Sequence, residues 1–278
     1  MLVSAAFVAG VVVIGATVFV VREHTIEFRN RVEYITNPVE VRAQLNAAIH
    51  PYVFGSNILF NLDREQITEV IELNEPRVRV TNIEVHFPNR VEITIRERYP
   101  QFVYRRDGRV LILDGQLRIV DDRELPRSLI DISDQIDVPV GDAQIGNYLF
   151  DYLPFAIDGF IEYNNQIQMT KMQRLIDAGM FFGGRGNYED SLNHLFSTIE
   201  FCNLRGEIDV RFVIREVATE GRIRNEIHMY NVECQELFFE KLASVMWALE
   251  QRPFPGIYRV FQTESGRIRV VSPVDPSL

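Results

Sequence analysis

Few of the side chains that commonly do chemistry in proteins stand at a spacing that catalysis or metal binding requires. The five histidines are His24, His50, His86, His194 and His228. They form no His-Glu-x-x-His segment, and neither Cys202 nor Cys234 stands at zinc-ligand spacing from any of them. The chain also lacks a Gly-x-Ser-x-Gly nucleophile segment, and its acidic residues are scattered. We therefore expect no catalytic residue, no metal and no cofactor, and we predict that the chain is not an enzyme.

Two further chemical features, a phosphate-binding loop and a disulfide, are suggested more weakly by the sequence. The glycine-rich residues 183–186 could cradle a phosphate, but no strand-loop-helix fingerprint surrounds them, so a plain loop is the favoured interpretation. Cys202 and Cys234 could form one disulfide if the domain lies outside the cytoplasm, and two free thiols fit the sequence equally well.

The charge balance excludes two classes of partner. The formal net charge is −10 at pH 7. Nucleic acid requires a basic face, and so does docking onto an anionic lipid surface through a basic patch. We therefore expect neither kind of binding.

The N-terminus predicts a membrane anchor. Residues 2–21 form an apolar run interrupted only by Ser4 and Thr17, and a helix of that length matches the hydrocarbon core of a bilayer. A cleaved signal peptide is the alternative, although the run is long and lacks a small-x-small cleavage site. Topology is undecided from the charges: Arg22, Arg29 and Arg31 follow the run, which would favour a cytoplasmic soluble part, but long domains translocate largely regardless of charge.

Residues 22–100 predict a small β-α-α-β-β module. A strand is expected over residues 26–35, followed by a helix that begins at Asn37-Pro38 and ends at His50-Pro51. Asp63 and Gln66 predict the cap of a second helix. Two alternating strands then flank a turn at Pro88-Asn89, and a phase change predicts a bulge near Thr81-Asn82. One sheet face covered by two helices accounts for the apolar positions.

These residues resemble the FtsQ/DivIB family of bacterial cell-division proteins, whose first extracytoplasmic module is a POTRA domain. Residues 55–63 are similar to the family's Gly-x-Asn-Leu-Phe loop, and residues 87–100 to its hairpin with the closing Glu-x-x-Pro. Arg77 and Thr81 stand where the family usually has Trp and Ala. The resemblance implies an α+β fold: an N-terminal transmembrane helix (1–21), a POTRA-like domain (22–100) and a mixed β domain with flanking helices (101–278).

The second module ends in a pattern typical of that β domain. Strands are expected over residues 208–214 and 223–229, joined by a hairpin at 219–221, followed by an amphipathic helix and a last hairpin over 257–271. The stretch 147–190 is rich in aromatic residues and is interpreted as an insertion. Within it a helix is expected over residues 169–180, with Met172, Leu175, Ile176 and Met180 on one face.

The resemblance implies a scaffold in the plasma membrane, with a single span and an extracytoplasmic soluble part, that holds divisome partners of the FtsB/DivIC and FtsL type at the septum. We expect binding by strand addition at the last hairpin. The partner-binding residues predicted on this basis are Tyr258, Phe261, Ile268, Val270 and Val271. The alternative is a membrane-tethered ligand-binding sensor or enzyme with a pocket near residues 147–190.

Overall fold

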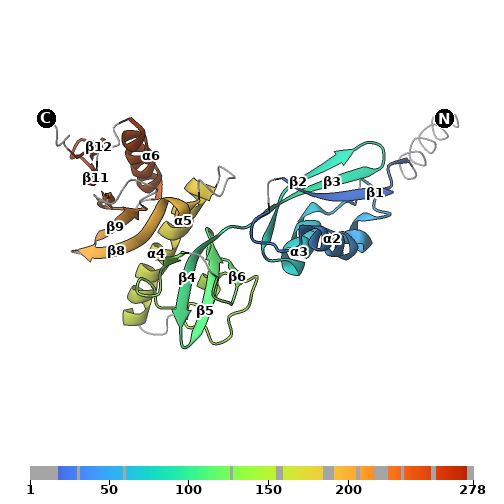
Figure 1. Ribbon diagram of the computed structural model, residues 1–278, viewed down its shortest axis with the longest axis horizontal. Coiled ribbons are helices and arrows are strands. Elements are labelled where there is room, and N and C mark those ends of the chain that lie inside the picture. Colours follow the sequence, from blue (N-terminus) through green and yellow to red (C-terminus); the bar gives the residue numbers. More distant parts are fainter. Residues whose placement is uncertain are drawn as a thin grey trace, which may run out of the picture. The chain divides into compact units, whose positions relative to one another are not determined.

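The α+β fold class is confirmed by the structure, a computed structural model (Figure 1). The residues that it describes are 18–29, 32–58, 61–125, 128–154, 159–183, 191–204, 207–215, 225–232, 235–251 and 255–273. The chain divides between Arg98 and Tyr99 into two compact units, which are described separately.

The first unit has the predicted order of elements. These are β1 (Glu23–Phe28), α2 (Pro38–Val53), α3 (Arg64–Asn74), β2 (Val78–His86) and β3 (Arg90–Glu97). The sheet order is β1-β3-β2, with β1 parallel and β2 antiparallel to the central strand β3. The two helices lie on one side of this sheet (Figure 1). Apolar residues from both helices and all three strands form one core, as expected for a sheet with one covered face.

The local signals that define these elements are largely confirmed. The side chain of Asn37 accepts a hydrogen bond from the N–H of Glu40, and that of Asp63 accepts one from the N–H of Gln66, so both predicted residues cap their helices. The β2–β3 register shifts between Val80 and Asn82, where the bulge was expected.

Two boundaries in this unit were predicted wrongly. Strand β1 ends at Phe28, and residues 32–35 are not in a strand. Helix α2 continues through Pro51 to Val53, because Val53 is fully buried in the core and its contacts hold the last turn.

The predicted membrane anchor lies outside the described residues as far as residue 17. Its last residues belong to the first unit, since Val21 is fully buried in the core. Among the helices that the structure describes, none is both long enough and apolar enough to span a bilayer.

The second unit contains two sheets around one large core. Its first elements are β4 (Pro100–Arg106), β5 (Arg109–Asp114), β6 (Ile119–Asp121), β7 (Ile130–Asp131), the 3-10 helix η1 (Leu149–Tyr152), α4 (Gly159–Gly183) and α5 (Leu192–Leu195). Its last elements are β8 (Phe196–Leu204), β9 (Glu207–Ile214), β10 (Glu226–Met229), α6 (Gln235–Gln251), β11 (Ile257–Gln262) and β12 (Ile268–Val271).

The five-stranded sheet has the order β12-β11-β10-β9-β8. All its neighbouring strands are antiparallel except β10 and β11, which are parallel and are joined through α6. The strand-strand-helix-strand-strand order predicted for this region is therefore confirmed. The four-stranded sheet has the order β6-β5-β4-β7.

Several details of the second unit differ from the sequence predictions. Helix α4 is much longer than the predicted 169–180, and Met180 is exposed whereas Met172 and Leu175 are buried. Strand β8 was not predicted. The predicted hairpin at residues 219–221 and the glycines at 184 and 186 lie outside the described residues.

The end of β3 is linked to the rest of the first unit by two charged residues, Glu97 and the adjacent Arg98. The buried carboxylate of Glu97 accepts hydrogen bonds from the N–H groups of Glu33, Tyr34 and Ile35, which connect β1 to α2. Burial raises the pKa of the Glu97 carboxyl, and the three N–H donors oppose that rise. The adjacent Arg98 donates to the carboxylate of Glu72 on α3 and to the carbonyl of Val78.

We predict that Glu97→Ala lowers the free energy of unfolding by about 3 kcal/mol, because buried N–H donors lose their acceptor. Urea denaturation followed by circular dichroism measures this change. The control is Glu69→Ala on the exposed side of α3, which should change stability by no more than about 0.5 kcal/mol. Equal stability of the two variants would contradict the role assigned to Glu97.

Candidate functional site

The candidate site is the edge formed by β12, the last strand of the five-stranded sheet. Among the strands that the structure describes, β12 pairs with β11 alone. Its other side is therefore an open edge, where backbone N–H and C=O groups can pair with another chain.

The turn before β12 determines which backbone groups face that edge. The N–H of Thr263 donates to the carbonyl of Arg267 at 2.8 Å, and Gly266 adopts a positive φ of 78°. In an antiparallel ladder, hydrogen-bonded pairs alternate with non-bonded pairs. Counting from Thr263 and Arg267, Ile268 and Val270 fall in non-bonded pairs, opposite Gln262 and Val260. The N–H and C=O groups of Ile268 and Val270 therefore point to the open edge.

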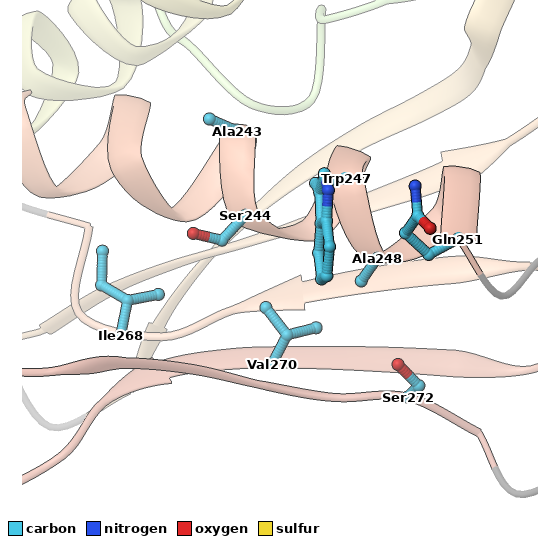
Figure 2. Close-up of a pocket in the computed structure, with 8 residues that line it drawn as sticks. All are labelled: Ala243, Ser244, Trp247, Ala248, Gln251, Ile268, Val270 and Ser272. Carbon is cyan, nitrogen blue, oxygen red and sulfur yellow. The ribbon is translucent and has the colours of Figure 1, made fainter.

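A groove lies between this strand and helix α6 (Figure 2). Its volume is about 640 Å³, and we call it the terminal groove. The residues that line it are Ala243, Ser244, Trp247, Ala248, Gln251, Ile268, Val270 and Ser272. The lining residues of β12 are thus also those whose backbone groups face the open edge.

Trp247 is the prominent side chain of the terminal groove. It is the single tryptophan of the chain and is 64% exposed. Figure 2 shows its indole ring pointing from α6 toward Val270 on β12. Trp247 was not predicted as a site residue, although the sequence carries a signal for it. The buried stripe of α6 runs through Phe238, Leu242 and Val245, and position 247 lies off that stripe.

Helix α6 is held in place by a buried lysine. Lys241 is fully buried, and its ammonium group donates hydrogen bonds to the carbonyls of Tyr230 and Asn231, just after β10. Asn231 has a positive φ of 52°, an arrangement that asparagine tolerates better than most residues. This contact fixes α6 relative to the sheet and so fixes one wall of the terminal groove.

The five predicted partner-binding residues do not share one surface. Tyr258 is fully buried in the core of the second unit, so the prediction that it contacts a partner does not fit its position. Ile268 and Val270 are half-buried and line the terminal groove. Phe261 and Val271 lie on the opposite face of the sheet, where Val271 is exposed and Phe261 is half-buried. The sequence could not separate these faces because the hairpin register was not known.

The opposite face of the sheet is charged. Arg211 on β9 contacts Glu200 on β8 at 2.7 Å and Glu226 on β10 at 2.8 Å, and these two carboxylates raise its pKa. His228 lies 2.9 Å from the same Glu226. These pairs link three neighbouring strands. Farther along the same face, Arg259 and Arg269 are exposed on the last hairpin.

The aromatic-rich stretch buries mostly aliphatic side chains: among its described aromatic residues Phe182 alone is buried, and Phe150 is exposed. Leu149, Met172, Leu175 and Phe182 are buried, while Tyr163 on α4 is exposed. Phe155 and Phe160 have no described side chains. Within the described part of the chain, no group of three or more His, Cys, Asp or Glu side chains could hold a metal ion. Cys202 is a free, exposed thiol, and Cys234 lies outside the described residues.

No protein-family model matches the chain, and no curated protein matches it significantly.

We predict that alanine substitutions of the two aromatic residues of this region, Trp247 and Tyr258, differ strongly in their effect on stability. Trp247→Ala should change the free energy of unfolding by no more than about 0.5 kcal/mol, because most of the side chain is exposed. Tyr258→Ala should cost roughly 3 kcal/mol or more, because it opens a cavity in the core. Chemical denaturation of both variants measures the difference. A large loss of stability in Trp247→Ala would show that Trp247 is a structural residue and not a surface contact.

Proposed function

We propose that this chain is a non-enzymatic, membrane-tethered scaffold of the FtsQ/DivIB type, which binds divisome partners by strand addition at β12. One observation carries the proposal. The backbone groups of Ile268 and Val270 point to an open sheet edge, and their side chains line a groove beneath an exposed tryptophan.

The order of elements supports the family assignment. The β-α-α-β-β order of the first unit is that of a POTRA domain, and residues 55–63 and 87–100 resemble the corresponding family segments. The second unit ends, as the family's β domain does, in two strands, a helix and a final hairpin. In this family the soluble part is extracytoplasmic and is held by a single span in the plasma membrane.

Strand addition explains how such a surface could combine affinity with specificity. A partner strand beside β12 would form hydrogen bonds with the N–H and C=O groups of Ile268 and Val270. Because side chains of a strand alternate, every second partner side chain would enter the terminal groove and contact Trp247. The others would lie on the opposite face, beside Arg269 and Val271.

The charges near the edge favour an acidic partner. The whole chain carries a net charge of −10, yet Arg259, Arg267 and Arg269 are all exposed on the last hairpin. Opposite charges across an interface accelerate association and exclude partners with like charge. We therefore expect partner segments of the FtsB/DivIC and FtsL type to present carboxylates on the face that meets these arginines.

We predict that Val270→Pro abolishes partner binding while the domain stays folded. Proline removes the N–H group that faces the open edge and leaves the β11–β12 hydrogen bonds intact, because Val270 lies in a non-bonded pair. The measurement is co-purification of the chain with the extracytoplasmic segments of FtsB/DivIC- and FtsL-type proteins from the same genome.

The matched control is Val270→Thr, which keeps the N–H group and the branched side-chain shape. This variant should bind to within about threefold of the unchanged chain, since a free-energy change well below 1.4 kcal/mol is expected. A Val270→Pro chain that has the unchanged circular dichroism spectrum and still binds its partners would refute strand addition at β12.

A further inference from the structure

A group of exposed apolar side chains surrounds the place where the N-terminal apolar run meets the first unit. Residues 2–21 are apolar in sequence, and their last members are already part of the fold. The apolar run thus leads into the folded unit without a polar spacer. We call residues 19–22 the neck.

The neck is fixed on both sides by backbone hydrogen bonds. On one side, the N–H of Val21 donates to the carbonyl of Ser56 at 2.8 Å, and the N–H of Gly55 donates to the carbonyl of Val21 at 3.0 Å. On the other side, the N–H of Arg22 donates to the carbonyl of Asn89 at 2.9 Å. The neck therefore runs between the loop that follows α2 and the turn that joins β2 to β3.

Both flanking segments carry an exposed phenylalanine. Phe87, in the turn after β2, is 64% exposed, and its ring lies edge-on to that of Phe19 in the neck, 5.7 Å between centroids. Phe54, directly after α2, is 51% exposed and stacks on His50. Val18 is also exposed. Partly exposed apolar rings therefore lie in the segments on each side of the neck.

We propose that the rings of Phe54 and Phe87 insert into the interfacial layer of the bilayer that holds the N-terminal apolar run, so that the first unit rests directly on the membrane. This inference deepens the proposed function, and it rests on the membrane anchor that this function includes. The loop after α2 and the β2–β3 turn then each contact lipid directly, in addition to the anchor.

The position of these rings indicates that the surface they contact is a lipid bilayer. Exposed apolar patches mark binding surfaces, and interfacial segments bury Phe and Leu side chains at the boundary between headgroups and acyl chains. The ring contact between Phe19 and Phe87 places Phe87 beside the end of the apolar run. Because the neck is hydrogen-bonded on both sides, a membrane that holds the run also meets the residues next to the neck.

The test uses the full chain, reconstituted into phosphatidylcholine vesicles with or without bromine on the acyl chains. Trp247→Phe first removes the only native tryptophan. Phe87→Trp or Phe54→Trp then places a single fluorophore beside the neck. Both positions are exposed, so the substitutions should leave the fold intact.

Leu73→Trp is the matched control. Leu73 is also an exposed apolar residue of the first unit, at 61%, but it precedes the start of β2, whereas Phe87 follows its end. Nine residues of strand separate these two ends by about 30 Å, which is the thickness of a whole hydrocarbon core. A fluorophore at position 73 should therefore remain in water.

We expect brominated lipid to lower the emission of Phe87→Trp and Phe54→Trp by about twofold or more, with a blue-shifted maximum, and to leave Leu73→Trp unchanged. Flotation of the same vesicles shows separately whether the chain is anchored in the membrane. Chains that float but show equal, weak quenching at all three positions overturn the lipid contact and leave the anchor and the partner-binding proposal standing. Chains that do not float overturn the anchor, and the lipid contact with it.

Discussion

The parallel pairing of β10 with β11 is the constraint on which the second unit depends. Parallel neighbours cannot be joined by a tight turn, so the chain must cross over the sheet between them. Helix α6 is that crossover, and Lys241 fixes it to the end of β10 through two carbonyls. As a result α6 covers the inner face of the sheet, and β12, added by a short hairpin, lies at the edge beside it. The terminal groove is a consequence of this connectivity.

The same edge has features that limit unspecific pairing. Natural sheets protect open edges with short strands and with charged side chains. Strand β12 has four residues, and Arg269 lies within it. Such an edge offers few hydrogen bonds to an unrelated strand. A partner that also fills the groove beneath Trp247 and meets the arginines gains contacts that an arbitrary strand lacks. In this way a short open edge can resist unspecific pairing and still bind one partner selectively.

Local signals in the sequence predicted most of the first unit, and long-range contacts explain the errors. The Asn37 and Asp63 caps and the bulge at residues 80–82 depend on near neighbours, and they were predicted correctly. The helix extension past Pro51 depends on Val53 reaching the core, which no local rule shows. Strand β8 was missed because a register shift between Phe196 and Thr198 interrupts its alternation.

The candidate site was predicted only to the level of the hairpin. Alternation along β11 and β12 is visible in the sequence, but which alternate set faces α6 depends on the register between the strands and on the helix above them. That is why Tyr258 was placed at the surface and Trp247 was overlooked.

Exposure alone does not identify a binding surface either, since Phe87 and Trp247 are equally exposed. What distinguishes them is their surroundings: Trp247 stands over a groove beside β12, the edge strand of the described sheet, which suits a polypeptide, whereas Phe87 stands beside the end of an apolar run, which suits lipid. The role proposed for each ring therefore rests on its neighbours in the fold and not on its residue type.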